Sequence, residues 1–328
     1  MAPLALAPRV AGSSGGLEGS DKRGVPEVDK LIECVPNFSE GRRPEVVSAI
    51  VDVMRGQGVT VLDVHSDAAH NRSVVTVVGS PEQVLEAAFA ACREAARLID
   101  MEQHRGEHPR IGATDVIPLV PFEGTSLDEC VGWARQLGRR IGEELGIPVY
   151  LYGAAATRPD RVRLADVRRG EYEGLKEAIA LPERHPDFGP ARLHPRAGAV
   201  AVGARPFLIA FNVNLACEDL GVARAIARAV RESSGGLPAV QALGLQREDG
   251  SVQVSMNLLD YRRTSLPAVY ERVVEEARRR GVEVSGSELV GLAPAEALLD
   301  VVRHFLRAPE LTADQVLEVR LWHAGRQG

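Results

Sequence analysis

Hydrophobic and polar positions along the first part of the chain follow two periods, one typical of strands and one typical of helices. Short apolar runs predict strands, and longer stretches with an apolar face every three or four residues predict helices. The strands are expected at residues 31–35, 59–64, 73–78 and 116–120, and the helices at 45–54 and 81–100. This order is βαββαβ, the split βαβ arrangement.

The same order of elements occurs a second time. Its strands are expected at residues 207–213, 240–246, 252–257 and 282–285, and its helices at 220–232, 267–280 and 295–306. A helix near 127–145, a strand at 148–152 and a helix near 164–179 extend the first half. We therefore predict an α/β fold of the α+β kind, with two tandem βαββαβ ferredoxin-like subdomains and a ligand cleft between them. The expected division is a disordered tail over 1–29, a first subdomain over 30–207 and a second over 208–328.

Composition adds limits rather than a function. The chain has 328 residues and a formal net charge of -6, which argues against general nucleic-acid binding because phosphate contacts need a basic surface. No apolar run approaches the roughly 20 residues that span a bilayer. The four cysteines, Cys34, Cys92, Cys130 and Cys217, are scattered without a close pair. Reduced thiols in a cytoplasmic protein are the expectation, with no membrane partner.

Residues 104–115 are the densest group of charged and titratable side chains between two predicted elements. His104 and His108 have the spacing of a helical metal clamp, but Gly106 and Pro109 argue against a helix there. His108 is therefore interpreted as a single exposed histidine, suited to proton transfer near neutral pH. The structural alternative is a hydrogen-bonded histidine without a chemical role.

Two further segments leave alternatives open. Residues 181–206 hold five prolines and four arginines with little periodicity, which fits either a stiff connector or a long loop with a binding role. The group Asp63, His65, Asp67 and His70 could supply ligands to a metal-dependent hydrolase, together with His104 and His108. The same residue types also make turns between antiparallel strands.

Several motifs in order along the chain carry a resemblance. They are Glu-Cys-Val-Pro-Asn-Phe-Ser-Glu-Gly at 33–41, Asn-Arg at 71–72, residues 104–115, Val-Tyr-Leu-Tyr-Gly at 149–153, Gly-Glu-Tyr-Glu at 170–173, Pro-Asp-Phe-Gly-Pro at 186–190, Phe-Leu-Ile-Ala-Phe-Asn-Val-Asn at 207–214 and Gly-Ser-Glu-Leu-Val-Gly-Leu at 286–292. With these motifs the chain resembles the formiminotransferase family. The resemblance implies transfer of a formimino group from N-formimino-L-glutamate to N5 of tetrahydrofolate in histidine degradation, giving L-glutamate and 5-formiminotetrahydrofolate.

The resemblance also implies cofactors and partners. Tetrahydrofolate is expected as co-substrate, with no metal, and a homodimer is expected. Because no cyclodeaminase domain follows within these 328 residues, we expect a single-function form whose product passes to a separate cyclodeaminase. A folate-binding module without catalysis is the remaining alternative.

His108 is the catalytic residue that the resemblance implies, acting first as base and then as acid. Asp63, Asp67, Glu107 and Asp115 are candidate carboxylates for the protonated amidine of the donor. The expected substrate-binding and folate-binding residues are Asn37, Asn71, Arg72, Glu107, Arg110, Asp115, Asn212 and Asn214, together with the loop Gly189, Pro190, Ala191, Arg192, Leu193, His194, Pro195, Arg196, Ala197 and Gly198.

Overall fold

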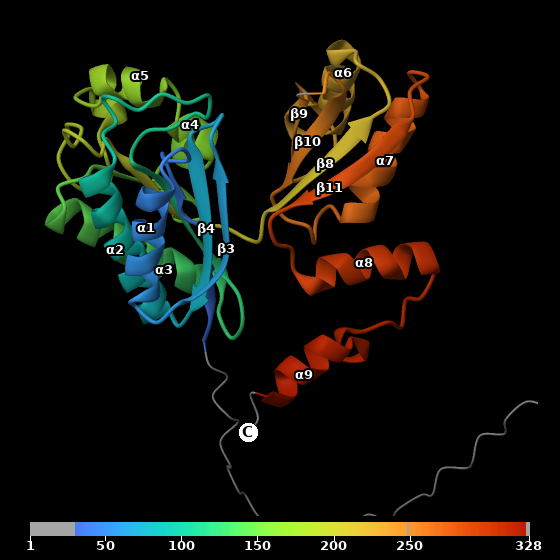
Figure 1. Ribbon diagram of the computed structural model, residues 1–328, viewed down its shortest axis with the longest axis horizontal. Helices are drawn as coiled ribbons and strands as arrows, with labels where there is room; N and C mark the ends of the chain where they lie inside the picture. Colours follow the sequence, from blue (N-terminus) through green and yellow to red (C-terminus); the bar gives the residue numbers. More distant parts are fainter. Residues whose placement is uncertain (1–29, 248, 326–328) are drawn as a thin grey trace, which may run out of the picture.

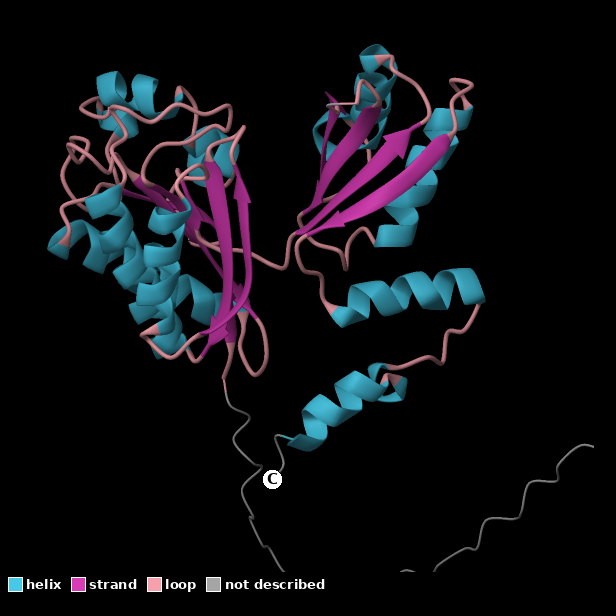
Figure 2. Cartoon of the chain, in the orientation of Figure 1, coloured by secondary structure: helices cyan, strands magenta, loops and turns pink. Residues whose placement is uncertain are grey.

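A computed structural model describes residues 30–247 and 249–325, so the predicted tail over 1–29 lies outside the described residues. The described chain forms one sheet of seven strands and one of four. Figure 1 shows each sheet in a lobe of its own, and Figure 2 shows that helices cover one face of each sheet. The predicted class, an α/β fold built from two tandem repeats, is confirmed.

The first sheet begins with the predicted βαββαβ order. Its strands are β1 (Ile32–Cys34), β2 (Asn37–Phe38), β3 (Thr60–Asp67), β4 (Arg72–Gly79) and β5 (Thr114–Pro121). The pair β1 and β2 is one strand interrupted at Pro36, which has no N–H to donate, and both parts lie between β4 and β5. β3 pairs with the other edge of β4.

Three helices pack on one face of this sheet: α1 (Pro44–Arg55), α2 (Pro81–Leu98) and α3 (Leu127–Glu144). α2 and α3 begin where the sequence places a serine followed by Gln or Glu three residues later. Ser80 with Gln83, and Ser126 with Glu129, form reciprocal capping boxes that satisfy the free N–H groups of the first turn.

The sheet continues beyond β5 in a way that the pattern did not predict. β7 (Val200–Ala204) lies between β5 and β6 (Val149–Gly153) and pairs in parallel with both. The interpretation of residues 181–206 as a connector without regular structure is therefore wrong at its end. β7 is buried along its whole length, so it lacks the alternation that marks a half-buried strand.

The helix expected near 164–179 is two helices, α4 (Leu164–Val167) and α5 (Glu171–Ala178). Gly170 between them has a φ of 84°, and Glu171 a φ of 55°. A left-handed residue cannot continue an α-helix, and glycine adopts this conformation without a steric penalty. The two helices cover the second face of the sheet over β5, β6 and β7 and leave β3 and β4 open there.

The second lobe repeats the order with few additions. Its strands are β8 (Ile209–Leu215), β9 (Val240–Gln246), β10 (Val252–Leu258) and β11 (Val284–Val290), and its helices are α6 (Leu220–Val230), α7 (Leu266–Arg278), α8 (Ala295–Leu306) and α9 (Leu317–Gly325). The antiparallel order β11-β8-β10-β9 matches that of β5, β1, β4 and β3. α9 was not predicted. Short 3₁₀ helices occur at Pro159–Arg161, Pro182–Arg184, Glu232–Ser234 and Ala313–Gln315.

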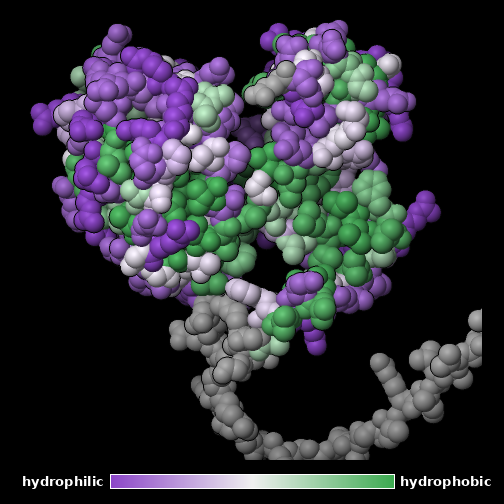
Figure 3. All heavy atoms as spheres, viewed as in Figure 1, coloured by the Kyte–Doolittle hydropathy of each residue, from purple (hydrophilic) through white to green (hydrophobic). Residues whose placement is uncertain are grey.

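Each lobe has its own core. The cores of the first lobe come from residues 32–204, and the core of the second lobe comes from residues 209–297. Figure 3 shows a hollow between the two lobes, where the cleft between repeats was expected. Among the described helices, none is both long and apolar enough to cross a membrane.

Candidate active site

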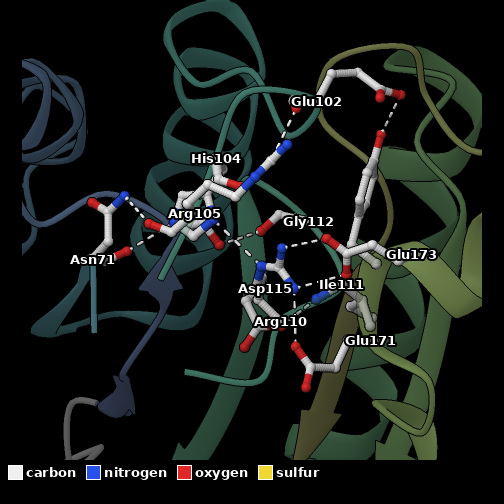
Figure 4. Close-up of polar contacts among 12 residues, drawn as sticks. Asn71, Glu102, His104, Arg105, Arg110, Ile111, Gly112, Asp115, Glu171 and Glu173 are labelled. Atoms are coloured by element: carbon white, nitrogen blue, oxygen red, sulfur yellow. Dashed lines mark hydrogen bonds and ion pairs between the residues drawn. The ribbon is translucent and has the colours of Figure 1, made fainter. Parts of the chain in front are cut away.

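The segment between α2 and β5 is not helical, as Gly106 and Pro109 predict. His104 is buried, and both of its ring nitrogens have partners. Nε2 lies 3.0 Å from the carbonyl oxygen of Asn71, and Nδ1 lies 3.3 Å from Nε of Arg110 (Figure 4). Because arginine only donates, Nδ1 accepts and Nε2 carries the proton. His104 is therefore a structural histidine, which leaves His108 as the candidate histidine for proton transfer in this segment.

Asn71 fastens this segment to the turn between β3 and β4. Its Oδ1 accepts from the N–H of Gly41 at 3.0 Å, and its Nδ2 donates to the carbonyl oxygen of Arg105 at 2.9 Å. Its φ is 49°, a conformation that asparagine tolerates better than most residues. The two backbone segments approach so closely that a Cβ on Gly106 would lie 2.3 Å from the carbonyl oxygen of His70. Asn71, predicted to bind substrate, positions the loop that carries His108.

Arg72 and Asn37 face each other across β4 and β2. Asn37 donates to the carbonyl oxygen of Val35 at 2.9 Å, and its Oδ1 accepts from Nε of Arg72 at 3.0 Å and also from Nη2. The amide is thus oriented by its own strand and presents an acceptor to the guanidinium. Burial and the nearby charge of Arg168 lower the pKa of Arg72 to about 10.

Asp115, at the start of β5, has both carboxylate oxygens engaged. Oδ1 accepts from the N–H of Ile111 at 3.0 Å, and Oδ2 accepts from Nη2 of Arg168. The first bond closes the backbone turn before β5. The second ties that turn to the end of α4, because Arg168 follows this helix directly. Arg168 was not among the predicted site residues, and its neighbour in the chain is the Gly-Glu-Tyr-Glu motif that begins at Gly170.

The side chain of Arg110 bonds to two glutamates of α5. It is buried, and its guanidinium donates to Glu171 at 2.9 Å and to both oxygens of Glu173 at 2.9 and 2.6 Å (Figure 4). A buried guanidinium held by two carboxylates is a strong structural link. Glu107, another predicted binding residue of this segment, is exposed.

His108 lies half-buried at a small hollow of about 180 Å³. The lining residues are Phe38, Ser39, His70, Asn71, Arg72, His104, His108, Arg110 and Asp115. Burial lowers the pKa of His108 to about 3, helped by the charges of Arg72, Arg168 and His70. The imidazole is therefore neutral at physiological pH and can accept a proton. The rings of His70 and His108 are arranged edge to face, with their centroids 6.5 Å apart.

A larger cavity lies beside Tyr150, away from His108, and its empty volume is about 830 Å³ where that of the His108 hollow is about 180 Å³. Two of its arginines are already held by carboxylates. Arg161 contacts Asp187 at 2.7 Å, and Arg169 contacts Asp166 at 2.7 Å. We assign the active site to the smaller hollow, because a half-buried neutral histidine and a poorly compensated guanidinium meet there.

The alternative metal site has no support among the described residues. Asp67 accepts from the backbone N–H of His70 at 2.9 Å and contacts its Nδ1 at 2.6 Å. Within residues 30–247 and 249–325, no three His, Cys, Asp or Glu side chains lie together in a group that could hold a metal ion. The Asp63, His65, Asp67 and His70 group is a strand and its turn, which removes the geometric basis for the metal-dependent hydrolase.

The loop from Gly189 to Gly198 folds back onto the active-site segment. The carbonyl oxygen of Arg196 accepts from the N–H of Met101 at 2.9 Å, and that of Ala197 accepts from Ala113 at 2.8 Å. His194 stabilises the turn, since its Nδ1 accepts from the N–H of Ala197 at 3.0 Å. Arg196 itself is exposed. The loop thus reaches the residue just before β5, the strand that carries Asp115.

Comparison with known proteins decides the family. The family description "Formiminotransferase domain, N-terminal subdomain" matches residues 31–205, and "Formiminotransferase domain" matches residues 210–321. The chain belongs to the formiminotransferase family. The resemblance that the motifs carry is therefore confirmed, and these matches cover both lobes of the formiminotransferase fold.

Relatives with curated names support the same assignment. The chain is 46% identical over 295 residues to the glutamate formimidoyltransferase of Streptococcus pyogenes serotype M1, covering 89% of this chain and 99% of that protein. It is 49% identical over 295 residues to the glutamate formimidoyltransferase of Thermoplasma acidophilum, covering 89% and 97%. With the formimidoyltransferase-cyclodeaminase of Gallus gallus it shares 47% over 290 residues, covering 86% of this chain and 53% of the relative.

Asn212 and Asn214 lie on β8, in the second lobe of this formiminotransferase-family chain. They point to the face opposite the helices, because Val213 between them is part of the core. Nδ2 of Asn212 donates to Glu288 of β11 at 3.4 Å, while Oδ1 of Asn214 is buried without a partner. The hollow around His108 is lined entirely by the first lobe, so these two asparagines belong to a separate polar face.

Proposed function

We propose that this chain transfers the formimino group of N-formimino-L-glutamate to N5 of tetrahydrofolate. The products are L-glutamate and 5-formiminotetrahydrofolate, in histidine degradation. The observation that carries the proposal is a neutral, half-buried His108 beside Arg72 and Asp115. It occurs in a chain 46% and 49% identical to glutamate formimidoyltransferases over nearly their whole length.

The reaction is an exchange of nitrogens on an amidine carbon. N5 of tetrahydrofolate attacks the formimino carbon, and a tetrahedral carbon forms that carries both nitrogens. N5 must then lose a proton, and the glutamate nitrogen must gain one before its bond to carbon breaks. A neutral histidine accepts the first proton and returns it to the leaving nitrogen. Holding both substrates in one site supplies much of the remaining acceleration.

A carboxylate should hold the protonated amidine of the donor. Asp115 is poorly suited, because Arg168 already neutralises it and both its oxygens are engaged. Asp67 accepts from the backbone N–H of His70 and contacts its ring Nδ1, so, unlike Asp115, it has no arginine in direct contact among the described residues. Of the four predicted carboxylates, we favour Asp67, since Asp63 lies farther along β3 and Glu107 is exposed.

The finer expectations belong to the same proposal. Tetrahydrofolate is the co-substrate, no metal takes part, and the loop Gly189–Gly198 contacts the folate. The chain works in the cytoplasm as a homodimer, with subdomains over 30–207 and 208–328, and passes its product to a separate cyclodeaminase. The support is the exposed arginines of that loop, which can pair with folate carboxylates.

A direct assay tests the function. Purified full-length chain is mixed with N-formimino-L-glutamate and tetrahydrofolate, and 5-formiminotetrahydrofolate is followed. We expect product at a rate proportional to enzyme concentration. Folded protein that binds tetrahydrofolate but makes no product would contradict the transferase and support a binding module without catalysis.

A further inference from the structure

Arg72 is a half-buried cation whose direct partner is neutral. Its guanidinium donates through Nε and Nη2 to the amide oxygen of Asn37, and the ion pairs of the described residues do not include it. Arg168 disfavours its charge further, while Asp115 and Asp67 compensate only from a distance. A guanidinium withdrawn from water is costly without an anion in contact. Arg72 therefore has capacity for an anionic ligand at the hollow that it lines.

Arg168 brings a second guanidinium to Asp115, which lines the same hollow. Its Nη2 donates to Asp115, whereas its Nε is buried without a partner. Its side chain is 16% exposed, so part of the group reaches solvent. The charges of both arginines act on His108. Of the two guanidiniums, only that of Arg168 is bonded directly to a carboxylate, Asp115, which lines the hollow.

We propose that Arg72 and Arg168 together bind the α-carboxylate of the amino-acid donor beside His108. The inference rests on the proposed function, because it names how that donor is held. In a formimino amino acid the α-carboxylate is attached to the same carbon as the amidine nitrogen. Anchoring this carboxylate on the arginines therefore brings the formimino carbon close to the hollow. Planar guanidiniums suit a carboxylate because they donate two parallel hydrogen bonds.

Donor binding then strengthens the base that the reaction needs. In the free site, burial together with Arg72, Arg168 and His70 holds the pKa of His108 at about 3, far below the pH at which a general base works best. A bound carboxylate opposes the two arginines and raises that pKa. The other charged or titratable neighbours are Asp67, His104, Arg110 and Asp115. They are tied to protein partners and change less on binding.

Proton NMR of the free enzyme and its complexes tests this coupling without any turnover. The His108 resonance, assigned by comparison with His108→Gln, is titrated alone and with L-glutamate, L-norvaline or 4-aminobutyrate. L-Glutamate and L-norvaline, which carry an α-carboxylate, should raise the pKa by roughly one unit or more. 4-Aminobutyrate, which lacks it, should have no effect. An unmoved His108 with saturating L-glutamate, or an equal response to 4-aminobutyrate, overturns the inference.

Arg168→Gln, with the neighbouring Arg169→Gln as control, separates this site from a general loss of charge. Arg169 is exposed and paired with Asp166 at 2.7 Å. We expect Arg168→Gln to raise KM for the donor roughly tenfold or more, leave KM for tetrahydrofolate unchanged and reduce the response of His108 to L-glutamate. Equal donor KM in the two variants overturns the inference.

Arg168→Lys covers the case in which the glutamine variant does not fold, because it keeps the charge beside Asp115. It should weaken L-glutamate binding, measured by calorimetry, while keeping most of the His108 response. Wild-type affinity in this variant overturns the inference. Failure of the transferase itself is distinguishable: it abolishes turnover in wild-type enzyme but leaves L-glutamate binding and the His108 response intact.

Discussion

The two lobes share one topology but differ in what their connections carry. In the first lobe the α2 to β5 connection, residues 99–113, holds His104, His108 and Arg110. In the second lobe the matching α7 to β11 connection, residues 279–283, is short and ends a helix. The open face of β8 presents amides rather than a proton-transfer group. The comparison teaches that the repeated fold supplies the frame and the inserted segments supply the chemistry.

The insertions after β5 complete this difference. α4 and α5 exist only in the first lobe, and they bring Arg168 to Asp115 and Glu171 and Glu173 to Arg110. The α2 to β5 segment is thus held from outside the repeat. The second lobe has no equivalent support in its described residues.

The largest expected effect is on turnover, in His108→Ala. Without a group to accept the N5 proton, kcat should fall roughly a hundredfold or more, as general acid–base catalysis contributes about 10²–10⁴. Tetrahydrofolate affinity should change little, because the folate contacts remain. The measurement is steady-state kinetics together with tetrahydrofolate binding. Near-normal kcat in folded protein would remove His108 from the mechanism and shift the role of base to a neighbouring carboxylate.

His104→Ala should separate support from chemistry within the same segment. It removes the partner of Nε of Arg110 and of the Asn71 carbonyl oxygen, and leaving such buried groups unsatisfied costs about 1–3 kcal/mol. Urea unfolding should show this loss of stability. The fall in kcat should be much smaller than for His108→Ala. A loss of kcat as large as that of His108→Ala, without a loss of stability, would reverse the two roles.

The pH dependence of stability gives a third comparison. The pKa of His108 is about 3 in the folded chain and about 6.5 when unfolded. Above pH 6.5 both states are neutral, and the stability is fully present. As the pH falls below 6.5, His108 becomes protonated in the unfolded chain but stays neutral in the folded chain. The free energy of unfolding therefore decreases down to about pH 3, by at most about 1.4 kcal/mol per pH unit.

His108→Gln should therefore lose less stability than wild type between pH 7 and pH 5, measured by urea unfolding at each pH. The pH profile of kcat/KM should also show no decline near pH 6.5 that is due to His108. This ratio reports the pKa values of groups in the free enzyme, where the pKa of His108 is low. A limb near 6.5 that disappears in His108→Gln would contradict the low pKa and the electrostatic environment that explains it.

The sequence pattern predicted the repeat well, because amphipathic helices and half-buried strands leave clear periods. The strand Val240–Gln246 and the helix Ala295–Leu306 begin and end where they were expected. β7 was missed because Val200–Ala204 is buried on both faces and follows a proline-rich loop, so neither period nor composition marks it. The break at Gly170 was passed over because a glycine inside a helical pattern is often tolerated.

The candidate site was predictable in part. Asn37, Asn71, Arg72, His108 and Asp115 all contribute to one region of the first lobe, because their segments lie at the ends of adjacent strands. Arg168 could not be found in this way. Its contact with Asp115 depends on the parallel strands β6 and β7, which place α4 against β5, and no local pattern encodes that approach. Arg110 shows the reverse case, since its sequence position suggested substrate and the structure gives it Glu171 and Glu173.

The smallest expected effect is in the second lobe, in Asn214→Ala. Oδ1 of Asn214 has no partner in the described structure, so its removal breaks no hydrogen bond through that atom, and stability should change within about 0.5 kcal/mol. If the open face of β8 binds folate, KM for tetrahydrofolate should rise while kcat stays near wild type, because uniform binding is lost. Ser255→Ala on the facing strand β10 is the matched control. An unchanged KM for tetrahydrofolate in Asn214→Ala would mean that Asn214 makes no substrate contact. A fall in kcat alone would give Asn214 a part in the chemistry that the comparison assigns to the first lobe.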